Sequence, residues 1–320
     1  MKKIWISNAL IVLALATSCK KEEVIPTPDP TTKEDGTALK NFYSQNLNDL
    51  KQTFTVDASI GATLTGTKGT KITIYPNSLL NGSGQNVSGN VTVELIEIYD
   101  RATMILGNKP TMGRLPNGDV APLVSGGEYF LQITQNGQIL NSNTGVFVQV
   151  PTNNPDFGMT LFDGEIDANG DLVWLAAEDS IAIGQDSAGG QWANSYQFID
   201  NSWGWTNVDR FYSDPRPKTT IKVKLPDGFD NTNSEVYITY DGEETALASM
   251  DIYTTDGYFS EHYGLIPIGL EIHVIAITMI DGVLNYAILP EIVDDNEIIT
   301  VNSFTAISEA DLVNLINNLP

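Results

Sequence analysis

Residues 70–99 have the sequence TKITIYPNSLLNGSGQNVSGNVTVELIEIY, and this stretch decides the fold class. Ile72 and Ile74 alternate with other residues in its first part, and the apolar residues of 91–95 do the same in its last part. Successive side chains of a strand point to opposite faces of a sheet, so this alternation indicates half-buried strands. The Asn81-Gly82 pair between the two parts tolerates the positive φ of a tight turn. The stretch therefore predicts β-structure.

The same turn signal extends the β prediction to the rest of the chain. Asn-Gly and Asp-Gly pairs occur nine times after residue 80, among strand-like runs at 129–134, 146–150, 220–225, 235–240 and 271–279. Tight turns between strands are typical of antiparallel sheets, and they argue against helical repeats and a Rossmann fold. We predict an all-β protein.

Two short helices are the expected exceptions. Apolar residues recur at three- and four-residue steps within 38–52, which predicts an amphipathic helix that docks on the first β-domain. Ser308 and Asp311 have the spacing of a capping box, which opens a C-terminal helix within 304–320.

The length of 320 residues is typical of about two domains. Four of the five tryptophans lie between residues 150 and 216, and Asp214-Pro215-Arg216-Pro217 has the composition of a hinge. We predict two β-sandwich domains, a first at 53–155 and a second at 217–303, joined by a Trp-rich connecting region at 156–216.

The N-terminal sequence predicts an exported lipoprotein. Lys2 and Lys3 precede the apolar run 4–16, which is too short to span a membrane comfortably and is typical of a signal peptide, here residues 1–18. Cys19 is the single cysteine of the chain and follows two small residues, as in the bacterial lipoprotein signal, where this cysteine is acylated. The alternative is a chance cysteine near a cleavage site. If Cys19 is acylated, residues 19–37 form an acylated, proline-rich tether.

The four residues after Cys19 indicate where in the cell envelope the protein is expected to lie. Lys20, Lys21, Glu22 and Glu23 resemble the charged tetrad that directs many Bacteroidetes lipoproteins to the outer face of the outer membrane. The alternative is an ordinary solvated run of charges. We expect a lipid-anchored outer-membrane protein that faces the cell exterior and contacts the membrane through acyl chains on Cys19.

The charge balance excludes several classes of partner and site. The chain has 17 Lys and Arg against 40 Asp and Glu, for a net charge of −23. Such a surface repels phosphate backbones, which excludes nucleic acid as a partner. A single cysteine excludes a disulfide framework and a thiolate zinc site.

One acidic segment has the spacing of oxygen ligands for a metal ion. An oxygen-bearing side chain stands at every second position, as in an EF-hand loop: Asp163, Glu165, Asp167, Asn169 and Asp171. Ala168 replaces the turn glycine of that loop, and Trp174 replaces its bidentate glutamate. The competing interpretation is a hairpin that turns at Asn169-Gly170. Calcium is the one cofactor that the sequence leaves open.

The Trp-rich segment has two interpretations. Its four rings could stack on sugars, or they could fill the core between two sandwiches, which is the commoner fate of tryptophan: Trp174, Trp192, Trp203 and Trp205. Neither His262 nor His273 stands in a sequence pattern typical of a catalytic triad. We expect no catalytic residues.

Three segments together resemble a family of uncharacterised Bacteroidetes surface lipoproteins: residues 64–99, Ser125–Tyr129 and Trp203–Phe211. The first domain of that family is distantly similar to the ZU5 β-sandwich of ankyrins and netrin receptors. ZU5 domains pack against neighbouring domains and proteins, so the resemblance implies an architectural role and supplies no ligand residue. The expected function is a non-catalytic scaffold or interaction protein. The alternatives are a glycan-binding surface module, with or without calcium, and a hydrolase that uses paired carboxylates.

Overall fold

A computed structural model describes residues 35–166, 172–188, 191–261 and 264–320. The all-β prediction is confirmed, because strands make up most of these residues. The described residues contain three helices: α1 (Thr37–Leu50), α2 (Arg101–Leu106) and α3 (Glu309–Asn317).

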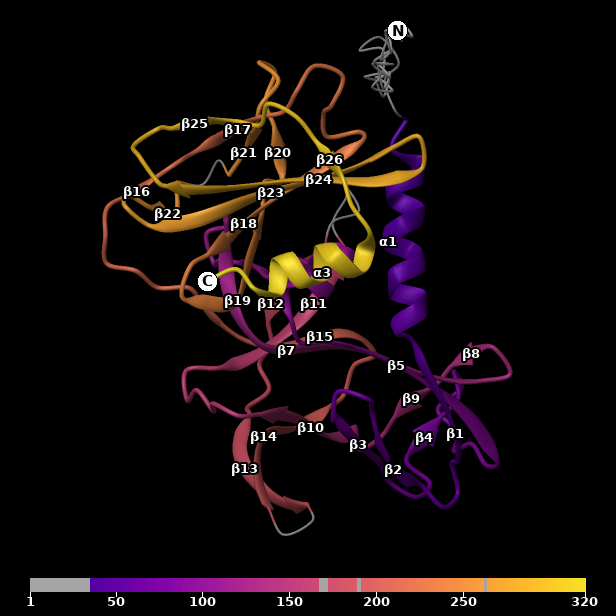
Figure 1. The fold of residues 1–320 in the computed structure, drawn as a ribbon. Coiled ribbons are helices and arrows are strands. Elements are labelled where there is room, and N and C mark those ends of the chain that lie inside the picture. The colour runs from indigo at the N-terminus through magenta and orange to yellow at the C-terminus, as the bar shows by residue number, and fades with distance from the viewer. Residues whose placement is uncertain (1–34, 167–171, 189–190, 262–263) are drawn as a thin grey trace, which may run out of the picture.

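A 13-stranded sheet runs through the middle of the molecule (Figure 1). Its strands are β1 (Gln52–Asp57), β5 (Asn90–Ile98), β6 (Met112–Arg114), β7 (Val120–Gln135), β8 (Gln138–Ile139), β11 (Thr160–Ile166), β12 (Leu172–Ala176), β15 (Gly204–Phe211), β18 (Ser234–Tyr240), β19 (Glu243–Ser249), β23 (Glu271–Ile280), β24 (Val283–Ile292) and β26 (Thr305–Ala306).

Smaller sheets lie at the two ends of the molecule (Figure 1). The lower one has five strands: β2 (Ala62–Thr65), β3 (Lys71–Ile74), β10 (Val146–Thr152), β13 (Ala182–Ala188) and β14 (Gln191–Asp200). The upper one has four strands: β17 (Lys222–Lys224), β20 (Ile252–Tyr253), β21 (Phe259–Ser260) and β25 (Ile298–Thr300). Two further pairs join β4 (Leu79–Leu80) to β9 (Asn141–Ser142) and β16 (Lys218–Thr219) to β22 (Ile266–Pro267).

Several of the predicted turn pairs form turns, whereas Asp163-Gly164 lies within β11 and Asn169-Gly170 lies outside the described residues. Asn136 and Gly137 both have positive φ and connect β7 to β8, and Asp281 and Gly282 do the same between β23 and β24. The stretch 70–99 differs from a simple hairpin, because β3 pairs with β2 and β10 whereas β5 pairs with β1 and β7. The chain therefore crosses from one sheet to the other after the turn at Asn81.

The strand β7 connects most of the large sheet. Its partners are β5, β6, β8, β15 and β19. Together β7, β15, β11, β12 and β6 are hydrogen-bonded in a closed circuit, which we call the five-strand ring. A small apolar cluster of Leu123, Phe162, Leu172 and Trp174 comes from three strands of this ring, and Trp205 and Phe211 of β15 pack against it.

The two predicted sandwiches share one sheet. Val124 of β7 pairs with Ala246 of β19, and the largest apolar cluster continues from Val56 to Val301. The division at 156–216 therefore stays a prediction.

The predicted terminal helices are present, and α1 contacts more than the predicted first domain. The helix contacts β5 of the predicted first domain, as expected, and it also contacts β23, which was not expected. Leu39 and Tyr43 of α1 join a second apolar cluster with Leu312 and Ile316 of α3. The capping box is confirmed, since Ser308 Oγ accepts a hydrogen bond from the Asp311 N–H at 3.2 Å.

Candidate functional site

Several sequence-predicted site residues lie outside the described residues. These are Cys19, the tetrad Lys20, Lys21, Glu22 and Glu23, and three of the proposed calcium ligands, Asp167, Asn169 and Asp171. Among the residues that the structure does describe, no helix is long and apolar enough to cross a membrane.

The other two proposed calcium ligands, Asp163 and Glu165, belong to β11. In the β11–β12 hairpin Asp163 pairs with Leu175 and Glu165 with Val173. Strand geometry places residues two apart on one face, which accounts for their alternation without a metal ion. Within the described ranges there is no group of three or more His, Cys, Asp or Glu side chains that could hold a metal ion.

The tryptophans lie at different depths. Trp174 is fully buried, and its Nε1 donates to the Pro110 carbonyl oxygen at 3.1 Å. Trp203 packs against the largest cluster and donates from Nε1 to the Leu140 carbonyl oxygen, and Trp205 packs against the other two clusters. The backbone of Trp192 pairs with Ser187 in the β13–β14 hairpin, whereas its side chain lies outside the described residues.

The described histidine takes part in a hydrogen bond with one carboxylate. His273 Nδ1 lies 2.9 Å from Asp241 Oδ1, and both side chains are mostly buried. Ser260 Oγ donates to the Ile221 carbonyl oxygen in the upper sheet. His262 is outside the described residues.

A β-bulge at Ser125–Tyr129 decides where the polar side chains of this motif point. Across β7 and β15, Ser125 pairs with Asp209 and Glu128 with Asn207, so the two glycines 126 and 127 face a single residue of β15. Residues three apart in a regular strand point to opposite faces. The extra residue instead turns Ser125 and Glu128 to the same face. Two segments that the sequence singled out separately therefore form one site.

The second glycine of the bulge cannot carry a side chain. Gly127 has φ 132°, a conformation that L-residues rarely adopt. A Cβ atom there would lie 2.8 Å from the ring of Tyr99 and 3.0 Å from Val150. The glycine thus allows β7 both to bulge and to pack closely.

Ser125, Glu128, Asn207 and Asp209 form what we call the buried carboxyl cluster. The exposed fractions of the Glu128 and Asp209 side chains are both 0%. Ser125 Oγ donates to Asn207 Oδ1 at 2.8 Å, and Asn207 Nδ2 donates to Glu128 Oε2 at 3.5 Å. Glu128 Oε1 and both carboxylate oxygens of Asp209 have no hydrogen-bond partner.

Burial dominates the electrostatics of this cluster. It raises the pKa of Glu128 well above its usual range, the negative charge of Asp209 raises it further, and Lys109 partly opposes both. Burial likewise raises the pKa of Asp209, against a smaller lowering by the Ser125 hydroxyl. Ser125 has only one proton, and the geometry directs it to Asn207. The cluster therefore contains many more acceptor oxygens than donors.

A second buried carboxyl group, Asp200 of β14, contacts Tyr129 of β7. Tyr129 Oη donates to Asp200 Oδ2 at 2.7 Å, and the Ser202 N–H donates to Asp200 Oδ1 at 3.0 Å. Burial raises the pKa of Asp200 to about 6, although both hydrogen bonds lower it.

Replacing Asp200 with asparagine is expected to stabilise the protein above pH 6. In the wild type the stabilisation from protonated Asp200 is fully present below the unfolded pKa of about 4 and is lost as the pH rises through about 6. A shift of this size corresponds to about 3 kcal/mol. Urea unfolding at pH 4, 6 and 7.5 should show a flatter pH profile for Asp200→Asn than for the wild type.

The matched control is Asp256→Asn, which changes an exposed aspartate in a turn. It should follow the wild type at every pH. Parallel profiles for Asp200→Asn and the wild type would contradict the assignment.

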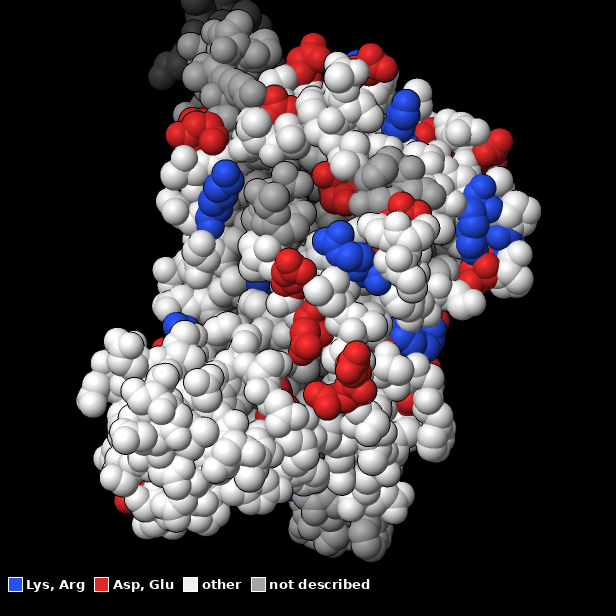
Figure 2. Space-filling model, turned by 180° about the vertical axis from the view of Figure 1, so that it is seen from behind, with Lys and Arg blue, Asp and Glu red and all other residues white. Residues whose placement is uncertain are grey.

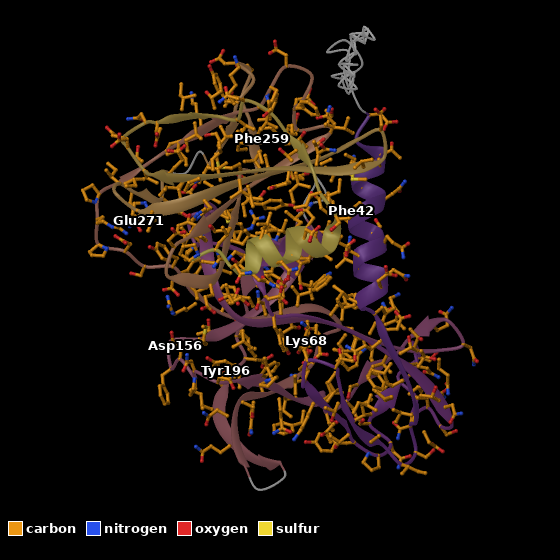
Figure 3. All side chains as sticks on the ribbon, viewed as in Figure 1. Phe42, Lys68, Asp156, Tyr196, Phe259 and Glu271 are labelled. Atoms are coloured by element: carbon orange, nitrogen blue, oxygen red, sulfur yellow. The ribbon has the colours of Figure 1, made fainter. Side chains whose placement is uncertain are left out.

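Two grooves lie away from the cluster. One of about 690 Å³ runs beside α1 and is lined by polar groups that include Lys40, Asn108 and Glu235. Another, of about 560 Å³, is lined by the carboxylates of Asp241, Glu271, Glu291, Asp294 and Glu297. Glu271 marks the second groove in Figure 3.

The lower lobe, by which we mean residues 58–93, 129–155 and 182–199, has almost no charge. Its only charged residues are Lys68, Lys71 and Asp186, whereas 18% of the whole chain is charged. Figure 2 shows the same contrast, with red and blue side chains mostly on the upper part and a nearly white lower part. Ile60, Tyr75 and Ile139 are exposed apolar side chains of this lobe.

The upper edge of the lower lobe is held by Asp156 and Tyr196, which lie together in Figure 3. The Asp156 N–H donates to Tyr196 Oη at 2.8 Å. Asp156 also accepts from Arg210 Nε at 2.7 Å, and Arg210 Nη2 donates to Glu243 at 3.0 Å. These contacts join the lobe to β15 and β19.

Comparison with known proteins gave no relative: no protein-family model matches the chain, and no curated protein or solved structure matches it either.

Proposed function

We propose that this chain is a non-catalytic, lipid-anchored protein of the outer membrane that presents its lower lobe to a partner as a scaffold or interaction surface. The observation that carries the proposal is the nearly uncharged lower lobe at the end of the molecule away from the start of α1 (Figures 1 and 2). An acidic protein with so few charged residues at one end has weaker long-range electrostatic repulsion there than elsewhere on its surface.

The placement of α1 supports a scaffold. This helix directly follows the predicted tether, and its Leu39 and Tyr43 are buried in the cluster that also contains Ile98 of β5 and Ile275 of β23. Force applied to an acylated Cys19 would therefore be transmitted through α1 to the large sheet. The finer division into sandwiches at 53–155 and 217–303 is also a proposal, supported by the two smaller sheets at opposite ends of the molecule.

The non-catalytic part of the proposal is supported by where the reactive groups lie. Glu128 and Asp209 are buried, so no substrate in solution reaches them without a rearrangement. His273 pairs with Asp241, and Ser260 is bonded in another sheet. A nucleophile and its base must lie within hydrogen-bond reach of each other.

Cys19→Ala should abolish palmitate incorporation completely and leave unprocessed precursor, because the thiol is the proposed site of acylation. Replacing Lys20–Glu23 with alanines should keep the label but protect the protein from protease added to whole cells. The measurement is metabolic labelling followed by surface proteolysis. Normal labelling of Cys19→Ala would refute the anchor, and unchanged proteolysis of the second variant would refute the export signal.

The lower lobe can be tested with a photocrosslinking residue at Ile139. Its side chain is 55% exposed, and Ile292 on the upper part is 61% exposed, so the two positions differ mainly in location. In intact cells Ile139 should give crosslinks to an envelope component and Ile292 should give none. Equal crosslinking, or crosslinks at Ile292 alone, would contradict a partner on the lower lobe.

A glycan-binding module is the second candidate, with or without calcium. It is favoured by Tyr75, a 39%-exposed ring on a lobe rich in amide and hydroxyl side chains, which suit an uncharged sugar. A panel of neutral polysaccharides should then bind the wild type and not Tyr75→Ala. Phe157→Ala is the control, since Phe157 is an exposed ring outside the lobe.

A further inference from the structure

The buried carboxyl cluster is unlike the other buried glutamate nearby. Glu97 is also buried, and its carboxylate accepts hydrogen bonds from the N–H groups of Lys68 and Thr70 and from Gln52 Nε2, each at 2.9 Å. The fold thus supplies a full set of donors to one buried carboxylate. Glu128 Oε1 and both oxygens of Asp209 receive none.

No ion pair with a described Lys, Arg or His neutralises the two acids, although Lys109 lowers the pKa of Glu128. None of the ion pairs between described residues includes Glu128 or Asp209. Lys109 acts on Glu128 from a distance, and its Nζ lies 3.3 Å from the Asn108 carbonyl oxygen and 5.4 Å from the centre of the Trp205 ring. Buried carboxylates without a cation are costly, so a balancing charge is expected between them.

We propose that the buried carboxyl cluster binds one calcium ion, held by the carboxylates of Glu128 and Asp209 with Asn207 Oδ1 and Ser125 Oγ. Calcium accepts six to eight oxygen ligands and tolerates irregular geometry. Two carboxylates neutralise its charge, and these two come from the neighbouring strands β7 and β15 and have oxygens without a hydrogen-bond partner. Magnesium keeps several waters, which a fully buried cluster does not favour, and zinc prefers nitrogen and sulfur ligands.

The competing arrangement has a proton on each carboxyl group. Burial favours this arrangement by raising the pKa of both acids, but a proton on each carboxyl group still leaves the other oxygen of that group without a donor. A single divalent ion would coordinate the same oxygens together. If the protein is exported as proposed, it meets calcium outside the cell. The supply of calcium depends on that proposed location, but the geometry of the site does not.

The test uses the purified chain after treatment with a chelator. At pH 7.5, 2 mM calcium should raise the melting temperature, and about one calcium should remain per chain after gel filtration, measured by elemental analysis. Glu128→Gln and Asp209→Asn should each lose the bound ion and the calcium-dependent shift. Glu165→Gln is the control: it removes a carboxylate of the acidic segment in β11 and should keep both.

Three results would overturn the proposal. In the first, the wild type retains no calcium and its melting temperature does not change with calcium, while Glu128→Gln melts higher at pH 7.5. The two carboxyl groups are then held by protons. Loss of calcium in Glu165→Gln but not in Glu128→Gln would place the ion at 163–171. Equal retention in all variants would mean adventitious binding to surface acids. None of these outcomes bears on the anchor at Cys19, which labelling tests separately.

Discussion

Gly127→Ala is expected to destabilise the protein by about 4 kcal/mol, or to prevent it from accumulating in soluble form. The backbone conformation at φ 132° costs an alanine about 1–3 kcal/mol, and a new Cβ meets Tyr99 and Val150 at 2.8 and 3.0 Å. Overpacking of a tight core adds about 1–3 kcal/mol. The bulge would straighten or the sheets would separate, and Glu128 would leave the face that it shares with Ser125.

A matched control comes from the strand opposite. Gly204 of β15 has φ 133°, but a Cβ there would meet no atom within 4 Å. Gly204→Ala should therefore cost only the backbone strain, and the difference between the two variants in urea unfolding isolates the clash. Equal losses of stability would show that packing around the bulge is not tight.

Trp174→Ala should lower the free energy of unfolding by about 3–5 kcal/mol. The ring is 0% exposed, it belongs to the apolar cluster of the five-strand ring, and its Nε1 donates to the Pro110 carbonyl oxygen. The substitution would leave a cavity and an unpaired carbonyl group. Trp174→Phe should retain part of this stability because it fills much of the volume.

The control for Trp174 is Phe157→Ala, which removes an aromatic ring that is 88% exposed. Surface substitutions of this kind stay within about 0.5 kcal/mol. If Trp174→Ala unfolds like the wild type but loses affinity for polysaccharide, the ring serves in stacking and not in the core.

The sequence was a good guide to local structure. Alternation around Ile72 and Val93 predicted strands, positive-φ pairs such as Asp281-Gly282 predicted turns, and Ser308 with Asp311 predicted the start of α3. Each of these signals operates within a few residues. The six-residue α2 was not predicted, because its single turn and a half is too short for a periodic pattern.

The pairing of strands that are distant in the chain could not be predicted from the sequence. Nothing near Ile74 shows that β3 and β5 enter different sheets. Likewise Ser125 and Asn207 are 82 residues apart, and they meet only because β7 and β15 are neighbours. The Gly126-Gly127 pair was the available signal, since adjacent glycines inside a strand pattern indicate a bulge.

The acidic segment shows why spacing alone is ambiguous. Asp163 and Glu165 are two residues apart, as in a calcium loop, but every second residue of a strand also shares one face. The buried carboxyl cluster has no such regular spacing. Its members are gathered by sheet pairing, and their unpartnered oxygens are visible only in three dimensions.

The central position of β7 limits how this protein can evolve. A protein segment that recombination exchanges between genes folds in its new setting only if most of its contacts are within the segment. Here one strand completes the five-strand ring, pairs with β5 below and reaches β19 above. Neither half can be exchanged without a compatible β7, so we expect sequence changes to be tolerated best at the ends of hairpins such as Asn136-Gly137, which lies in the turn between β7 and β8.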